Sequence, residues 1–233
     1  MMLQQIRMDA AAGRFDDWAL STVIDENIQA PVIAVDQFDE LHAAAGLNAS
    51  WPIGNAGLLH VYGYLLSTVV TPYGLKGDRW RDGALAEALG LAPEAFRLDA
   101  AAAAGDTVLQ RVTAAALPHL VKPSVPTGDR HVLDDELVTG LPDGPSGRPA
   151  ASATGDTWFR TTVVEASDRA GAALVYGVNE GGRMRLVTAF PLADPAGTLD
   201  ALATEPVRMR YNAALATAPP RSPLRRRAES HVR

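Results

Sequence analysis

Three apolar runs separated by short turn sequences limit the fold more than any other feature of this chain. The runs are rich in β-branched and aromatic residues and span positions 158–165, 172–178 and 183–190. Residues 167–171 and 179–182 separate them and contain the Asn, Asp and Gly residues typical of hairpin turns. The sequence therefore predicts an antiparallel sheet of three to four strands, with residues 207–211 as the candidate fourth strand.

Apolar and basic residues alternate along the end of this region. Met184, Leu186 and Phe190 share one parity and Arg183 and Arg185 the other, and residues 207–211 repeat the pattern. Strands alternate in this way when helices cover one face of a sheet and water covers the other. The wet side is predicted to form an arginine face of Arg160, Arg183, Arg185, Arg208 and Arg210.

The first 121 residues are predicted to be mainly helical. Apolar residues recur at helical spacing in residues 15–26, 38–45, 58–70, 83–89 and 107–117, most strongly in 58–70. Residues 32–35 are a candidate buried strand. Together with the sheet, these helices predict an α+β protein whose helical N-terminal half is packed on or linked to a small C-terminal antiparallel sheet.

Proline and glycine spacing divides the chain into four regions. Residues 1–121 are the helical region. Residues 122–155, where Pro and Gly recur, are a predicted linker or long loop, with a little structure expected inside it at residues 131–138. Residues 156–216 are the β region. Residues 217–233, rich in Arg and Pro, are a predicted disordered tail.

Composition excludes several classes of function. The chain has no cysteine, so a disulfide, a thiolate nucleophile and Cys-ligated zinc are ruled out. A net charge of −6 argues against a general nucleic-acid or membrane-surface binder. Neither a P-loop, a dinucleotide-binding glycine motif nor a metal-binding histidine spacing is present, so no cofactor and no metal are predicted. The N-terminus lacks the pattern of a signal peptide, and a cytoplasmic location is predicted.

One candidate site lies within residues 51–80. Asn55 precedes the predicted helix 58–70, and His60 and Tyr64 share a face of it because they stand four residues apart. If the following loop folds back, Lys76 and Arg79 are placed to bind a carboxylate or phosphate, with His60 as acid or base. The predicted catalytic residues are His60, Tyr64 and Lys76, and the predicted substrate-binding residues are Asn55, Tyr73, Arg79 and Arg185.

Each candidate site also has a structural interpretation. Asn55 is then a helix cap, His60 and Tyr64 are partly buried, and Asp78 pairs with Arg79 or Lys76 at the surface. The arginine face either grips an anionic ligand or an RNA backbone, or is a solvated face balanced by nearby carboxylates.

Two stretches resemble known families. Residues 60–67 and 71–76, with 185–191 and 210–213, resemble a group of actinobacterial proteins that carry an amino acid deaminase label. That resemblance implies C–N bond chemistry on an amino-acid-like or other anionic small molecule. Residues 182–191 are similar to the closing strand of small bacterial toxin ribonucleases, which implies RNA contacts from Arg160, Thr162, Arg185 and Thr188.

Three functions therefore stay open. The first is a small-molecule enzyme of amino-acid or secondary metabolism, and the second is an RNA-binding or ribonuclease-like protein. The third is a binding or regulatory module without catalysis.

Overall fold

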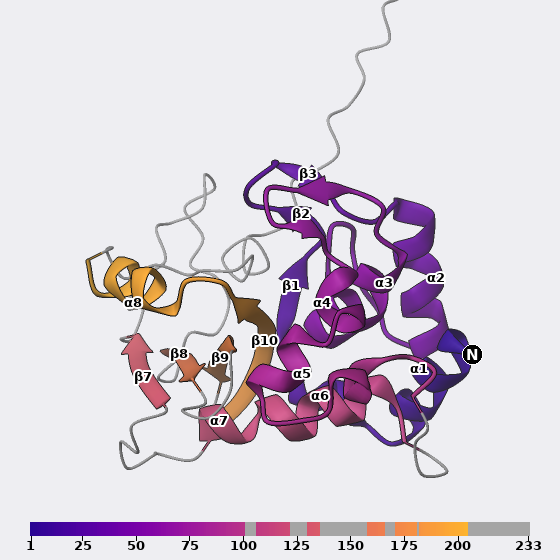
Figure 1. The fold of residues 1–233 in the computed structure, drawn as a ribbon. Coiled ribbons are helices and arrows are strands. Elements are labelled where there is room, and N and C mark those ends of the chain that lie inside the picture. The colour runs from indigo at the N-terminus through magenta and orange to yellow at the C-terminus, as the bar shows by residue number, and fades with distance from the viewer. Residues whose placement is uncertain (101–105, 122–129, 136–157, 166–170, 181, 205–233) are drawn as a thin grey trace, which may run out of the picture.

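The computed structural model describes residues 1–100, 106–121, 130–135, 158–165, 171–180 and 182–204. It confirms the α+β class: helices and short strands make up the N-terminal half, and an antiparallel sheet follows (Figure 1). The predicted fourth strand, the proposed linker other than residues 130–135, and the tail lie outside the described residues. No helix within the described residues has the length and apolar character needed to cross a membrane.

Four antiparallel strands form the main sheet, in the order β10-β9-β8-β7. Their bounds are Arg130–Asp135 (β7), Trp158–Glu165 (β8), Ala172–Glu180 (β9) and Arg183–Leu192 (β10). The three predicted strands are confirmed. The fourth strand that the structure describes is β7, which precedes them and lies in the region predicted as a linker.

A second apolar cluster overturns the prediction of a wet sheet face, and a bulge in β10 contributes to it. Leu186 pairs with Gly177 and Thr188 with Tyr176, so Val187 is an extra residue and the alternation changes there. Val187 packs in this second apolar cluster on the opposite face. The other buried members of this cluster are Ala19, Phe159, Leu174, Tyr176 and Val178, with Leu202 of α8 (Pro195–Thr204) packed against them.

The N-terminal half contains short elements joined by tight turns. Its helices and helical turns are α1 (Met2–Ala11), η1 (Arg14–Asp17), α2 (Val35–Ala45), η2 (Leu58–Gly63), α3 (Tyr64–Leu66), α4 (Asp78–Arg81), α5 (Ala84–Ala88), η3 (Pro93–Phe96), α6 (Val108–Ala116) and α7 (Pro118–Val121). Its strands pair antiparallel as β1 (Leu20–Thr22) with β4 (Ile53–Asn55), β2 (Ile24–Asp25) with β3 (Ala30–Pro31), and β5 (Val70–Thr71) with β6 (Gly74–Leu75).

Three of the predicted helices are confirmed and three predictions need correction. Helices α2, α5 and α6 match their predictions. Residues 15–26 form η1, β1 and β2, because the β-branched residues after Trp18 pair with partner strands. Residues 32–35 lie after β3 and enter α2, and the predicted helix 58–70 ends at Leu66 and begins as a π-helical turn.

The two halves share one apolar core. Its largest cluster joins N-terminal residues such as Trp18, Leu58 and Val112 to Val175 and Leu186 of the sheet. Figure 1 shows β10, the edge strand of the main sheet, beside β1 and on the side of the sheet that faces the N-terminal helices. The backbone N–H of Ala19 donates to the carbonyl of Leu186 at 2.8 Å, which joins the N-terminal chain directly to β10.

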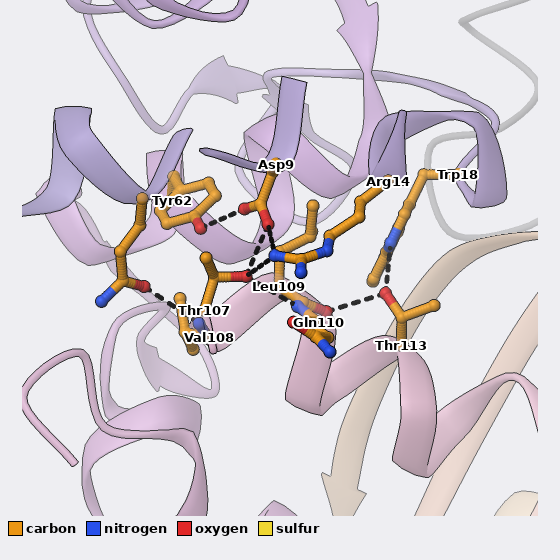
Figure 2. A network of polar contacts seen from close by, with 10 residues as sticks. Asp9, Arg14, Trp18, Tyr62, Thr107, Val108, Leu109, Gln110 and Thr113 are labelled. Atoms are coloured by element: carbon orange, nitrogen blue, oxygen red, sulfur yellow. Dashed lines mark hydrogen bonds and ion pairs between the residues drawn. The ribbon is translucent and has the colours of Figure 1, made fainter. Parts of the chain in front are cut away.

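A buried polar network fastens α1 to α6 (Figure 2). The Asp9 carboxylate is fully buried and accepts hydrogen bonds from the Tyr62 hydroxyl at 2.5 Å and the Thr107 hydroxyl at 2.5 Å. It also pairs with Arg14 at 3.0 Å. Thr107 is at the same time the N-cap of α6, accepting the backbone N–H of Gln110. Because Asp9, Tyr62 and Thr107 are all fully buried in the core, we assign this network to stability.

Candidate functional site

His60, in η2, joins the N-terminal half to the bulge of β10. Its Nδ1 lies 2.7 Å from the carbonyl oxygen of Val187, which can only accept, so this nitrogen carries the proton. The other nitrogen, Nε2, therefore accepts a hydrogen bond from the Ser21 hydroxyl at 3.0 Å. Both ring nitrogens are occupied, and the side chain is buried.

The surroundings of His60 keep its ring neutral. Burial, followed by the positive charges of Arg79 and Lys76, lowers the pKa of His60 to about 3, against the opposing hydrogen bond to Val187. The orienting group is a neutral carbonyl, which stabilises an imidazolium less than a carboxylate does. His60 therefore acts as a neutral link between β1 and β10 at physiological pH, and its role as acid or base stays a prediction.

This burial makes stability depend on pH. The pKa of His60 is about 3 in the folded protein and near 6.5 when unfolded, so between these values the unfolded chain binds the additional proton. We expect the contribution of neutral His60 to the free energy of unfolding to be complete above pH 6.5. It should fall by about 2 kcal/mol between pH 6.5 and 4.5. Chemical denaturation at several pH values in this range measures the free energy of unfolding. Its slope against pH should be shallower for His60→Gln than for the wild type, and equal slopes would contradict a buried, neutral His60. The pKa of buried His42 is also lowered, so some slope should remain in the variant.

Tyr64, Lys76 and Arg79 come together as the sequence predicts, and Asp25 and Phe190 complete what we call the Arg79 cluster. The Lys76 ammonium lies 2.5 Å from Oδ2 of Asp25 and 5.5 Å from the Tyr64 ring centroid. Asp25 is buried, and its Oδ1 accepts the backbone N–H groups of Asn27 and Ile28. Burial alone would raise the pKa of Asp25, but Lys76 and these N–H groups hold it below its usual value.

Arg79 differs from Lys76 because it has no carboxylate partner among the described residues. Its guanidinium carbon lies 5.2 Å from the centroid of the Tyr64 ring and 5.5 Å from that of Phe190. Its one hydrogen bond within the described chain is a long one, 3.5 Å, to the carbonyl of Ala189. The predicted surface pairing with Asp78 is therefore wrong for both cations: Lys76 pairs with Asp25, and Arg79 is held by rings.

Tyr64 supplies the surface against which both cations pack. Its ring also stacks on His60, with 4.8 Å between centroids. The residue is 3% exposed, and burial raises the pKa of its hydroxyl to about 12, so the hydroxyl stays protonated at neutral pH. No hydrogen bond of this hydroxyl is found within the part of the chain that the structure describes.

The other predicted site residues lie apart from this cluster. Asn55 is a structural cap: its side chain accepts the backbone N–H of Leu58 and donates to the carbonyl of Phe15. Tyr73 is 83% exposed at the β5–β6 turn, and Arg185 is half-buried on β10. Sequence reasoning missed Asp25, Ser21 and Phe190, because nothing near them in the chain marks them as partners of residues 60–79.

The arginine face does not form a continuous cationic surface in the described residues. Arg183 pairs with Asp17 at 2.9 Å, and Arg160 donates to the carbonyl of Leu120 in α7. Arg208 and Arg210 lie outside the described residues. No cluster of three His, Asp or Glu residues able to hold a metal ion occurs in the described ranges.

Comparison with known proteins gives no relative: no family model, no curated protein and no solved structure matches the chain.

Proposed function

We propose that this protein is a small-molecule enzyme that binds the carboxylate of an anionic ligand at Arg79. The observation that carries the proposal is the state of that guanidinium, which is half-buried between two rings and lacks a carboxylate partner among the described residues. The guanidinium has five donors and cannot lose its charge, and only one hydrogen bond from it is found among the described residues.

The charges of the cluster favour an anion over a neutral ligand. The negative charge of Asp25 is matched by Lys76 at 2.5 Å, and Arg79 forms no ion pair among the described residues, with Glu26 acting on Lys76 and Tyr64 only through space. The planar guanidinium fork fits a carboxylate with two parallel hydrogen bonds. Packing on Tyr64 and Phe190 fixes the orientation of the fork before a ligand arrives, which lowers the entropic cost of binding.

The resemblance of residues 60–76 to actinobacterial proteins labelled as amino acid deaminases supports the rest of the proposal. We place the enzyme in the cytoplasm, in amino-acid or secondary metabolism. Deamination or related C–N bond chemistry is the first reaction to assay, with ammonia release as the readout.

A binding module without catalysis is the second candidate. The observation that favours it is His60, whose two nitrogens are both hydrogen-bonded within the protein and whose pKa is lowered to about 3. RNA binding has no comparable support, since Arg160 and Arg183 are engaged by α7 and η1 in the folded chain.

Arg79→Gln tests the proposal. A thermal-shift and calorimetric panel of small carboxylic acids, each beside its neutral amide, should yield acids that bind while their amides do not. We expect the variant to bind those acids roughly ten to a hundred times more weakly, because a charge-assisted hydrogen-bond pair is lost. Arg7→Gln, the same change at an exposed position of α1, is the control and should bind as the wild type does.

Two results would count against the proposal. Unchanged acid binding by Arg79→Gln would move the site elsewhere, and equal binding of acids and amides would remove the role of charge.

A further inference from the structure

Lys76 combines the features of a lysine that reacts as an amine nucleophile. Its side chain is 11% exposed, so it is largely desolvated but reaches the surface. Burial lowers the pKa of Lys76, the hydrogen bond with Asp25 raises it, and the nearby charge of Arg79 lowers it again, with a net decrease. Desolvation and a neighbouring cation are the two ways in which proteins make a lysine amine nucleophilic.

The partner of Lys76 is a proton acceptor in the required place. Oδ2 of Asp25 lies 2.5 Å from Nζ, and the opposite oxygen, Oδ1, is fixed by the N–H groups of Asn27 and Ile28. Oδ2 is therefore aimed at the amine and can take its proton when a reacting carbon approaches.

We propose that Lys76 forms an imine with a 2-oxo acid whose carboxylate is bound by Arg79. This inference rests on the proposed carboxylate site and names its substrate class. In a 2-oxo acid the reacting carbonyl carbon is bonded directly to the carboxylate carbon, so the nucleophile and the carboxylate anchor have to lie close together. Lys76 and Arg79 both lie against the Tyr64 ring, at 5.5 and 5.2 Å from its centroid, and the charge of Arg79 acts on the Lys76 amine.

The reaction needs no further reagent. Asp25 takes a proton from the Lys76 ammonium, and the freed lone pair attacks the carbonyl carbon, opening the C=O bond to a carbinolamine. The carbinolamine oxygen receives that proton and one more from nitrogen, and it leaves as water. The ammonium and the ketone thus give a protonated imine and one water, and Asp25 ends as a carboxylate. The Tyr64 hydroxyl, protonated and without a partner among the described residues, is suited to donate a hydrogen bond to the ligand oxygen.

The sequence offers a built-in control for this proposal, because it contains two lysines, Lys76 and Lys122. The full chain is incubated with pyruvate and sodium cyanoborohydride, which reduces an imine to a stable secondary amine, and the adduct is located by peptide mass mapping. We expect labelling of Lys76 to exceed that of Lys122 and the N-terminal amine about tenfold or more. Lys122→Arg should keep the adduct and Lys76→Arg should lose it, with equal thermal stability showing that both are folded.

Arg79→Gln separates this inference from the carboxylate site. It should reduce labelling by pyruvate about tenfold more than labelling by propanal, which has no carboxylate and loses only the effect of the Arg79 charge on the Lys76 amine. Pyruvate binding that depends on Arg79 without any adduct on Lys76 would overturn the imine and leave the carboxylate site in place. An adduct on Lys76 that is indifferent to Arg79→Gln would overturn the carboxylate anchor, and equal labelling of both lysines would overturn the special reactivity of Lys76.

Discussion

Replacing Asp9 by alanine is expected to lower the free energy of unfolding by about 3–5 kcal/mol. The Asp9 carboxylate is fully buried and accepts from Tyr62, Thr107 and Arg14 at 2.5, 2.5 and 3.0 Å. Alanine leaves the buried Tyr62 and Thr107 hydroxyls without their acceptor and removes the carboxylate that pairs with Arg14. Figure 2 shows that these groups come from separate parts of the chain, so the loss also loosens α6 from α1.

Urea denaturation of the wild type and three variants measures this effect. Asp99→Ala, the same change at an exposed position, should alter the free energy of unfolding by less than about 0.5 kcal/mol. Asp9→Asn keeps one acceptor oxygen but loses the charge, so its cost should fall between those of the two alanine variants. A cost for Asp9→Ala no larger than that of Asp99→Ala would show that the network contributes nothing to stability.

Gly57→Ala is the second change with a large expected effect, a destabilisation of about 1–3 kcal/mol. A Cβ at Gly57 would lie 2.6 Å from Cγ of Trp18 and under 3 Å from two further indole atoms. The indole has no room to move, because Trp18 is buried and its Nε1 donates to the Thr113 hydroxyl at 2.9 Å. Gly57 has ordinary helical angles, where alanine by itself would be favourable, so a destabilisation can come only from the clash.

Gly171→Ala is the matched control for Gly57→Ala. A Cβ at Gly171 would meet Ala88 at 3.5 Å, an ordinary contact distance. Its denaturation midpoint should stay near that of the wild type while that of Gly57→Ala falls. Equal midpoints for the two variants would mean that the Trp18 ring adjusts without cost.

Short-range sequence patterns predicted the strands and helices whose conformation depends mainly on their own residues and on adjacent turns. Strands β8, β9 and β10 follow from β-branched runs with turn residues between them, and α6 from its apolar spacing. Residues 15–26 were predicted as a helix because Phe15 and Trp18 have helical spacing. Their position is instead set by contacts with residues that are distant in the sequence. Strand β1 pairs with β4, and the backbone N–H of Ala19 donates to the carbonyl of Leu186. The second face of the sheet is buried by Phe159, Leu174, Tyr176 and Val178, and the bulge adds Val187 of β10 to it, a change of parity that no pattern in the sequence marks.

The candidate site likewise contains some residues that the sequence predicted and some that it did not. Tyr64, Lys76 and Arg79 were found because they lie within one short stretch of helix and loop, and the structure brings them together. Asp25 was not found, although it decides which cation is neutralised, because its contact with Lys76 joins β2 to the turn after β6, far apart in the sequence. Asn55 and Tyr73 had the right residue types but serve as a helix cap and an exposed turn.

The hydrogen bond between His60 and Val187 joins groups 127 residues apart, so the ribosome completes one partner well before the other. A ribosome adds about 5–20 residues per second, so roughly ten seconds separate the synthesis of the imidazole from that of the carbonyl it binds. During that interval the nascent N-terminal half lacks β10, and Trp18 and Leu58 lack the sheet residues that share their core. We therefore expect this half to complete its core only after β10 has been synthesised, and to expose part of that apolar surface until then.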